Sequence, residues 1–367
     1  MRDEYTSVRH LSWRDKRRGS LKVVCLGLTS IASAISILHW NETRVNMAIL
    51  ANESVDVRDN AATQGKLVSV TGSILTDLPL GDDQFLIPGN YAVVDRTVEM
   101  YSWYEREQTQ KKKKLGGSEI ETTTYTYTKK WTKDSIDSSK FKYAAAHSNP
   151  TKSIPDRLFK ATSVRIDRYN LDMNSLSYVT NFRSNCSNRN LGNLWSESKT
   201  TSMYRSIVLR SSDALTLTAQ NTQQQSNSII TPKYIFRGLG SPQAPQVGDV
   251  RVCYAVMPVG AMVTVFGRLD QSQITVYPYQ NVQFLRLIPG NRLAALKILG
   301  NEEIIWKWVF RFLGFFLMWL GIAALLYPIV VLFDFFPWLG WFVEILGQKL
   351  APLLALAATI ATILLSL

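Results

Sequence analysis

The residues best suited to bind a metal or to act as nucleophile and base are three cysteines and three histidines. They are Cys25, Cys186, Cys253, His10, His39 and His147. No two of them have the C-x-x-C or H-x-x-x-H spacing that places two ligands on one metal, so neither a zinc site nor a framework of several disulfides is expected. A single Cys186–Cys253 bond in an oxidising compartment stays open, because a sequence does not show whether two side chains are within reach.

The short motifs of common enzymes are missing from the sequence. It contains no G-x-S-x-G, no Walker loop and no H-E-x-x-H, and Gly238-Leu239-Gly240 is followed by Pro242 rather than by a helix. A Ser-His or Cys-His site in the middle of the chain would depend on His147, which fits better as a turn residue before Asn149-Pro150. We expect no catalytic residue, cofactor or metal, and a membrane-tethered hydrolase would lack its nucleophile and base.

Charged groups beside apolar stretches form a second set of candidates. Glu42 and Arg44 follow the first apolar stretch directly, and they could pair with each other or with Asp334 and Arg311. A charge pair at low dielectric is costly unless it is satisfied, so such pairing would lock the N-terminal helix to the C-terminal helices. The alternative is solvation by lipid headgroups. The candidate residues of this lock are Trp40, Asn41, Glu42 and Arg44.

Asp334 and Glu344 are the only acids inside the C-terminal apolar region. A carboxylate at membrane depth is typical of an ion path, a proton path or a contact with a partner. If Asp334 and Glu344 lie at the membrane boundary instead, that position explains them equally well. They support the alternative function of a channel or transporter subunit.

Four consecutive lysines, Lys111, Lys112, Lys113 and Lys114, could contact anionic lipid. They fit an exposed loop between expected strands at 98–107 and 122–131. Lys and Arg number 41 against 29 Asp and Glu, a net charge of +12. Because these charges are divided between two sides of a membrane and lack an aromatic-rich basic motif, no nucleic-acid partner is expected.

Apolar stretches at both ends of the 367 residues predict membrane helices. Residues 23–40, 312–333 and 350–367 carry no charge, and about 20 apolar residues cross a bilayer core of about 30 Å. Residues 335–347 are interrupted by Glu344, so they either borrow residues from Pro328 onward or dip in and return. We expect a transmembrane helix at 23–40, a retained anchor rather than a signal peptide, and a cluster of two to three helices at 304–367.

Five basic residues predict the orientation of the first helix. They precede it closely and are Arg14, Lys16, Arg17, Arg18 and Lys22. By the positive-inside rule residues 1–22 are cytoplasmic, so residues 41–303 face the periplasm or an organelle lumen. With four crossings the C-terminus returns to the cytoplasm, and with three it does not.

The middle region has the period-two alternation of strands, as in Thr124-Tyr125-Thr126-Tyr127-Thr128 and Gln273-Ile274-Thr275-Val276-Tyr277. Residues 65–74 and 260–269 share the pattern G-x-[LM]-V-[ST]-V-x-G-x-[IL], and each is followed by a related Gln-Phe-Leu and Ile-Pro-Gly-Asn segment. We interpret this as a duplication. The expected fold is a multi-pass α-helical membrane protein with a mainly β (α+β) extracytoplasmic domain, which contains two related small β-barrel modules at about 61–145 and 241–300, joined by a segment at about 146–240.

The segment Trp40-Asn41-Glu42-Thr43-Arg44-Val45 resembles the W-N-E-G-R-x-V signature of the transmembrane protein 43 (LUMA) family, with Thr43 where the signature usually has Gly. Further matches follow in order at residues 65–68, 96–103, 147–150 and 248–252. The resemblance implies a four-pass membrane protein that organises other proteins rather than a known enzyme. In animals the family is associated with the endoplasmic reticulum and inner nuclear membrane and with emerin and lamins. It also occurs in bacteria, and it supplies no catalytic residues.

Together these features predict a non-enzymatic integral membrane scaffold. Its extracytoplasmic β domain would organise protein assemblies, and its helices would support a homo-oligomer. The expected partners are the lipid bilayer, a second copy of the chain and other membrane proteins. The expected location is the bacterial inner membrane, or the endoplasmic reticulum or inner nuclear membrane of a eukaryote.

Overall fold

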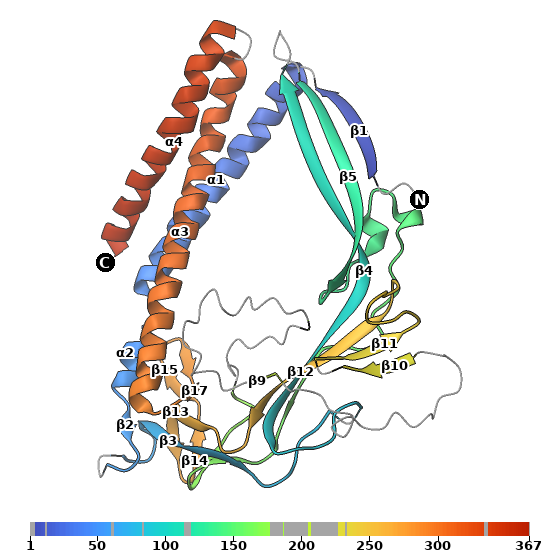
Figure 1. Ribbon diagram of the computed structural model, residues 1–367. Coiled ribbons are helices and arrows are strands. Elements are labelled where there is room, and N and C mark those ends of the chain that lie inside the picture. The colour runs from blue at the N-terminus through green and yellow to red at the C-terminus, as the bar shows by residue number, and fades with distance from the viewer. Residues whose placement is uncertain are drawn as a thin grey trace. The chain divides into compact units, whose positions relative to one another are not determined.

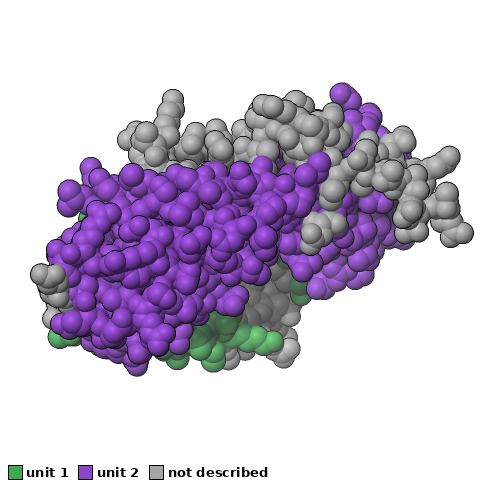
Figure 2. Space-filling view, turned by 90° about the horizontal axis from the view of Figure 1, so that it is seen from below, with its two compact units in different colours: residues 1–46, 106–126, 301–367 green, residues 47–105, 127–300 purple. Residues whose placement is uncertain are grey.

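The computed structural model describes residues 4–11, 13–59, 62–82, 84–113, 119–176, 186, 205–206, 227–231, 233–333 and 337–366 (Figure 1). The chain forms two compact units. The first comprises residues 1–46, 106–126 and 301–367, and the second comprises residues 47–105 and 127–300; Figure 2 colours them green and purple.

Three long helices account for most of the first unit. They are α1 (Trp13–Thr43), α3 (Arg292–Phe333) and α4 (Pro337–Ser366). The described residues contain three helical stretches long and apolar enough to cross a membrane, at Lys22–Asn52, Arg292–Ile329 and Lys349–Ser366. Residues 337–347, part of the segment expected at 335–347, form one continuous helix with 348–366.

Small residues allow α1 and α3 to pack closely. A Cβ atom added at Gly27 would lie 2.9 Å from the Gly321 carbonyl oxygen, and one added at Gly321 would lie 2.5 Å from Ile31. The Ser30 hydroxyl donates a hydrogen bond of 2.8 Å to the Leu317 carbonyl. Because lipid tails are as apolar as leucine, such close backbone contact and interhelical hydrogen bonds are what hold membrane helices together.

A closed five-stranded barrel lies in the second unit. Its strands are, in order around the barrel, β3 (Leu67–Thr76), β13 (Met262–Asp270), β14 (Gln273–Thr275), β8 (Tyr169–Leu171) and β7 (Val164–Ile166). All neighbours are antiparallel except β14 and β8. Two strands pair outside this ring, β2 (Val55–Asp56) with β3 and β17 (Arg286–Pro289) with β13. The core contains valines of β3 and β13 that are at most 1% exposed: Val68, Val70, Val263 and Val265.

The two copies of the repeated motif pair with each other in this barrel. The motif at 65–74 supplies β3, the motif at 260–269 supplies β13, and the two strands are antiparallel neighbours. The expectation of two separate barrel modules is therefore wrong: in the described chain both copies build one barrel. The physical reason is that a strand of one copy completes its hydrogen bonds on the other, which a pattern within one copy does not reveal.

A second sheet contains β4 (Tyr91–Lys113), β5 (Glu119–Thr132), β12 (Val250–Pro258), β11 (Ile235–Gly238) and β10 (Asn227–Ile230). Two short strands join it, β6 (Arg157–Lys160) on β4 and β9 (Arg205–Ser206) on β12. In the second unit its apolar core includes Val94, Val98, Val252 and Val256. Because β4 pairs with β12, this sheet also joins residues of both expected modules.

The remaining short elements are α2 (Met47–Asn52), a hairpin of β15 (Tyr277–Tyr279) and β16 (Val282–Phe284), and two 3-10 turns at Ser138–Lys140 and Ala144–Ala146. The alternating run expected at 124–128 lies in β5, and the run at 273–277 is divided between β14 and β15.

The N-terminal residues form a strand, β1 (Glu4–Leu11), that the sequence patterns did not predict. It pairs antiparallel with residues 119–126 of β5, with Arg9 opposite Glu121. This pairing requires residues 4–11 and 119–126 to share one compartment. A membrane-spanning α1 separates them, so the pairing and the expected cytoplasmic N-terminus exclude each other.

Candidate functional site

A charge cluster lies where α1 ends, and it is centred on Glu42. The Arg311 guanidinium donates from Nε to Glu42 Oε1 at 2.8 Å and from Nη2 to Oε2 at 2.9 Å. Lys307 Nζ lies 3.1 Å from the same Oε2. The Glu42 side chain is 0% exposed. A two-pronged guanidinium–carboxylate contact of this kind is among the stronger and more directional polar contacts in proteins.

Helix geometry places these groups together. Lys307 and Arg311 are four residues apart on α3, so both side chains project from the same face. Glu42 lies in the last turn of α1, beside Asn41, which is 2% exposed. The Asn41 side-chain amide donates to the Lys307 carbonyl and to Glu42 Oε1, both at 3.2 Å. The cluster therefore satisfies Glu42 with donors from both helices.

Arg44 makes a separate ion pair. Its Nη2 lies 2.7 Å from Glu303 Oε2, and its Nε donates to Asn41 Oδ1 at 3.5 Å. The sequence left two partners open for Glu42. The structure places Glu42 against Arg311, and it places Arg44 against Glu303.

Aromatic residues surround the cluster. Trp40 is 52% exposed and packs edge-to-face on Phe310, with ring centroids 5.2 Å apart. The Arg311 guanidinium lies 5.3 Å from the Trp308 ring centroid. Tryptophan is enriched where a membrane helix meets the headgroups, and residues 312–333 form the uncharged stretch that follows Arg311. Both features are typical of a helix end at a bilayer boundary.

The described contacts of the cluster are ion pairs and hydrogen bonds that connect α1 to α3. Glu42 contacts two cations and an amide. None of these described contacts supports a role for Glu42 as a general base. Removing one member would leave a buried or half-buried charge without compensation, which is costly at low dielectric. The arrangement joins α1 to α3 at one level of the membrane.

The other candidates from the sequence are placed differently. Asp334 lies outside the described residues, and Glu344 lies within α4 with its side chain outside them. Lys111 is exposed and 3.2 Å from Glu121, and Lys112 is exposed. Lys113 ends β4, with its side chain outside the described part, and Lys114 lies outside it altogether.

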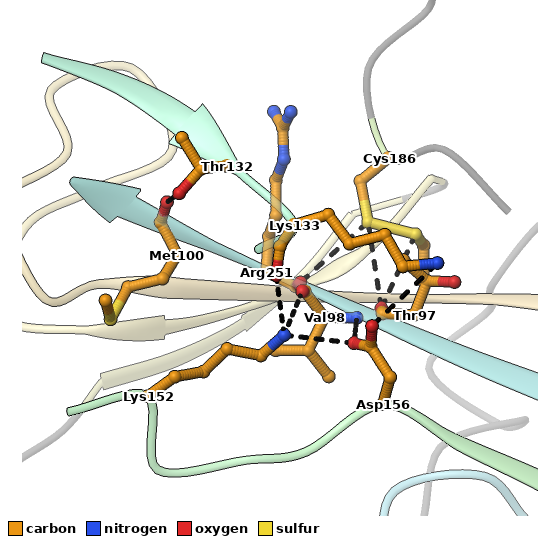
Figure 3. A network of polar contacts seen from close by, with 10 residues as sticks. Thr97, Val98, Met100, Thr132, Lys133, Lys152, Asp156, Cys186 and Arg251 are labelled. Atoms are coloured by element: carbon orange, nitrogen blue, oxygen red, sulfur yellow. Dashed lines mark hydrogen bonds and ion pairs between the residues drawn. A yellow bond between two sulfur atoms is a disulfide. The ribbon is translucent and has the colours of Figure 1, made fainter. Parts of the chain in front are cut away.

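A disulfide joins Cys186 to Cys253, with Cα atoms 5.6 Å apart (Figure 3). The two residues are separated by 67 positions, so sequence spacing did not indicate the bond. Cys25 is free and exposed. Structural disulfides persist in oxidising compartments.

Beside the disulfide, side chains complete the edge of β4 between the end of β5 and the start of β6. The Lys152 ammonium donates to the carbonyls of Val98 and Lys133, at 2.8 and 3.0 Å, while Asp156 accepts from the Val98 amide at 2.8 Å (Figure 3). Lys152 and Asp156 also pair with each other at 3.1 Å. They therefore satisfy the backbone groups that a neighbouring strand would otherwise satisfy.

Two buried ion pairs of the second unit were not predicted from the sequence. Asp82 accepts hydrogen bonds from Arg96, from Tyr254 and from the backbone amides of Phe85 and Leu86. Burial alone would raise the pKa of Asp82, but these donors outweigh it and lower the pKa. Arg251 pairs with Glu99 and lies 4.4 Å from the Trp131 ring centroid. Arg251 and Glu99 are directly opposite each other on β12 and β4, which is visible only once the register is known, whereas Asp82 lies in a segment outside both strands.

His147 is a packed aromatic residue at 0% exposure. Its ring stacks on Tyr127 at 3.7 Å and meets Trp103 edge-on at 4.7 Å, and its Nδ1 lies 3.0 Å from the Tyr143 carbonyl oxygen. Burial and the hydrogen bond to Glu105 raise the pKa of Tyr127 to about 12. This packing gives His147 a structural role. Among the described residues no three His, Cys, Asp or Glu side chains form a group that could hold a metal ion.

The apolar helices and the barrel define a class: an integral membrane protein with a large β-rich domain. Comparison with known proteins then gives the family. The profile described as Transmembrane protein 43 (TMEM43) matches residues 100–367, and the chain belongs to this family. The resemblance predicted from the sequence is thereby confirmed.

Curated relatives agree. The chain is 22% identical over 323 residues to "Transmembrane protein 43 homolog" of Drosophila melanogaster, covering 84% of this chain and 77% of that protein. It is 23% identical over 313 residues to "Transmembrane protein 43" of Homo sapiens, covering 82% and 70%. No solved structure matches.

Proposed function

We propose that the chain is a non-enzymatic integral membrane scaffold, whose helices mount a β-rich domain at one face of a bilayer for the assembly of other proteins. The observation that carries this proposal is the two-pronged contact between Glu42 and Arg311. It ties the first helix to the second at the membrane boundary. Helices that are held together in this way suit a protein whose function is to keep partner proteins in place.

A second anchor supports the same function within the second unit. Arg292, the first residue of α3, donates to the carbonyls of Asn52 and Ser54 at 3.1 and 2.8 Å. It also donates to the Ser69 hydroxyl of β3 at 3.1 Å. Within the second unit, the start of α3 is thus fastened directly to the barrel.

The disulfide supports an extracytoplasmic location for the β-rich domain, the periplasm or an organelle lumen. A Cys186–Cys253 bond is stable where the compartment is oxidising. With α1 spanning the bilayer, residues 1–22 then lie in the cytoplasm, in agreement with their basic charge. The proposed partners are lipid, a second copy of the chain and other membrane proteins.

The alternative function of a channel or transporter subunit depends on Asp334 and Glu344. Their side chains lie outside the described residues, so no contact in the structure favours it.

Chemical crosslinking in intact membranes, followed by mass spectrometry, tests the scaffold. We expect crosslinks to a second copy or to a recurrent membrane partner. They should be reduced by Glu42→Gln and retained by Lys111→Gln, which removes the ion pair of the exposed Lys111 side chain with Glu121. A protein that is monomeric and free of partners in crosslinked membranes and in mild detergent would contradict the proposal.

A further inference from the structure

The outer edge of β5 accepts a strand. Residues 4–11 form eight antiparallel pairs with residues 119–126, including Tyr5 opposite Tyr125 and Arg9 opposite Glu121. The edge therefore has the geometry that strand addition needs, and in the structure β1 fills its backbone hydrogen-bonding positions. The strand that it holds here belongs to the N-terminal segment of the same chain.

If α1 crosses a bilayer, β1 cannot stay paired with β5. Only Ser12 lies between β1 and α1, so residues 4–11 must follow the N-terminal end of α1. Between Asn52 and Arg292, the described residues contain no further helix long and apolar enough to cross a membrane. If α1 crosses, residues 4–11 lie on one face and β5 on the other. A charged strand cannot follow through the hydrocarbon core, so the edge of β5 is vacated.

The charges of β5 indicate what replaces β1. The strand is acidic at its beginning, with Glu119 and Glu121, and basic towards its end, with Lys129 and Lys130. A parallel copy of the strand would place like charges side by side. An antiparallel copy places Glu121 of each strand opposite Lys129 of the other and Tyr125 opposite Tyr125, on a twofold axis. Opposite charges across antiparallel strands stabilise the pair, and like charges destabilise it.

We propose that, in the membrane, the edge of β5 binds the β5 edge of a second copy of this chain. The two strands run antiparallel, with the twofold axis at Tyr125. The contact is isologous, so it closes as a dimer and covers the edge that would otherwise be open to aggregation. The inference rests on the proposed function in one respect, the membrane-spanning position of α1, and it adds the surface through which two copies meet.

Disulfide trapping in native membranes tests the proposal. In the full chain carrying Cys25→Ser, which removes the exposed free thiol, Tyr125→Cys should give a dimer-sized band on a non-reducing gel after mild oxidation. Adding Glu121→Lys should lower the yield about tenfold, and adding Lys129→Glu as well should restore it. Lys111→Gln, which removes the partner of Glu121 within the chain, should leave the band in place.

Two results would overturn the proposal, and they differ in what else they affect. If Tyr125→Cys gives no dimer while Cys186 and Cys253 remain bonded, the β5 contact is wrong and the membrane position of α1 stands. If Tyr5→Cys combined with Tyr125→Cys forms a disulfide within one chain, β1 stays on β5 in the membrane. That result would overturn both the contact and the proposed position of α1.

Discussion

Val70 lies directly opposite Val265 in the antiparallel pair of β3 and β13. The two valines occupy the same place in the repeated motif, so each copy meets the other about a local twofold axis through this pair. The first glycines of the copies agree as well, since Gly65 and Gly260 have φ angles of 82° and 84°. The two copies of the motif therefore supply paired strands of one barrel rather than of two separate barrels.

The second glycines of the two copies, Gly72 and Gly267, have different neighbours. The space around Gly267 gives a stability prediction. A Cβ atom at Gly267 would lie 2.7 Å from both Ile274 Cγ2 and the Thr275 carbonyl oxygen. We expect Gly267→Ala to lower the free energy of unfolding by about 1–3 kcal/mol. Gly300→Ala, at a helical position with open space, should instead be neutral or raise it by up to about 1 kcal/mol. Urea unfolding in detergent measures both, and equal effects would contradict the packing at Gly267.

The lowered pKa of Asp82 predicts a pH dependence. A carboxyl group whose pKa is depressed by folding stabilises the native state above its ordinary pKa of about 3.9, and that contribution is lost as the pH falls through the folded value. Below about pH 4 the free energy of unfolding should therefore decline. Asp82→Asn should lower it by about 2–4 kcal/mol at pH 7 and flatten the acid decline. Tyr254→Phe, which removes one donor, should flatten it in part. Tryptophan fluorescence during urea titrations at several pH values measures this, and an unchanged acid slope in Asp82→Asn would refute it.

The disulfide predicts the pattern of thiol labelling. Alkylation of the unreduced, denatured protein should modify Cys25 alone, and prior reduction should expose all three cysteines. Cys253→Ser should cost about 4 kcal/mol, because the bond closes a loop of 67 residues in the unfolded chain. Peptide mass spectrometry checks the labelling. Labelling of Cys186 before reduction in protein isolated from its native membrane would count against an oxidising compartment.

Loss of the central carboxylate of the cluster should loosen the helices. In Glu42→Gln, Arg311 and Lys307 lose their shared counter-charge. We expect a lower thermal midpoint in detergent, corresponding to about 1–3 kcal/mol. The exposed pair of Asp77 and Arg165 provides the matched control, and Asp77→Asn should leave the midpoint nearly unchanged. An equal response of the two variants would show that the cluster is not a lock.

The sequence predicted some of these contacts and missed others for identifiable reasons. The helices follow from uncharged stretches, and Arg311 was a recognisable partner for Glu42 because both flank such stretches. Barrel closure by β7 and β8 was not visible, since strands of three residues carry little pattern. Asp82 and Arg96 meet only through the fold of the 80–89 segment. The two cysteines are brought together by long-range folding, which spacing does not report.

In the proposed topology, α1 carries the chain across the bilayer and leaves the β-rich domain outside the cytoplasm. Membrane-impermeant thiol labelling of single cysteines in a Cys25→Ser chain tests it directly, with one cysteine at exposed Val8 and another at exposed Leu239. We predict that a reagent confined to the cytoplasmic face labels Val8→Cys and not Leu239→Cys. Labelling of both positions from one face, whichever face that is, would contradict the account.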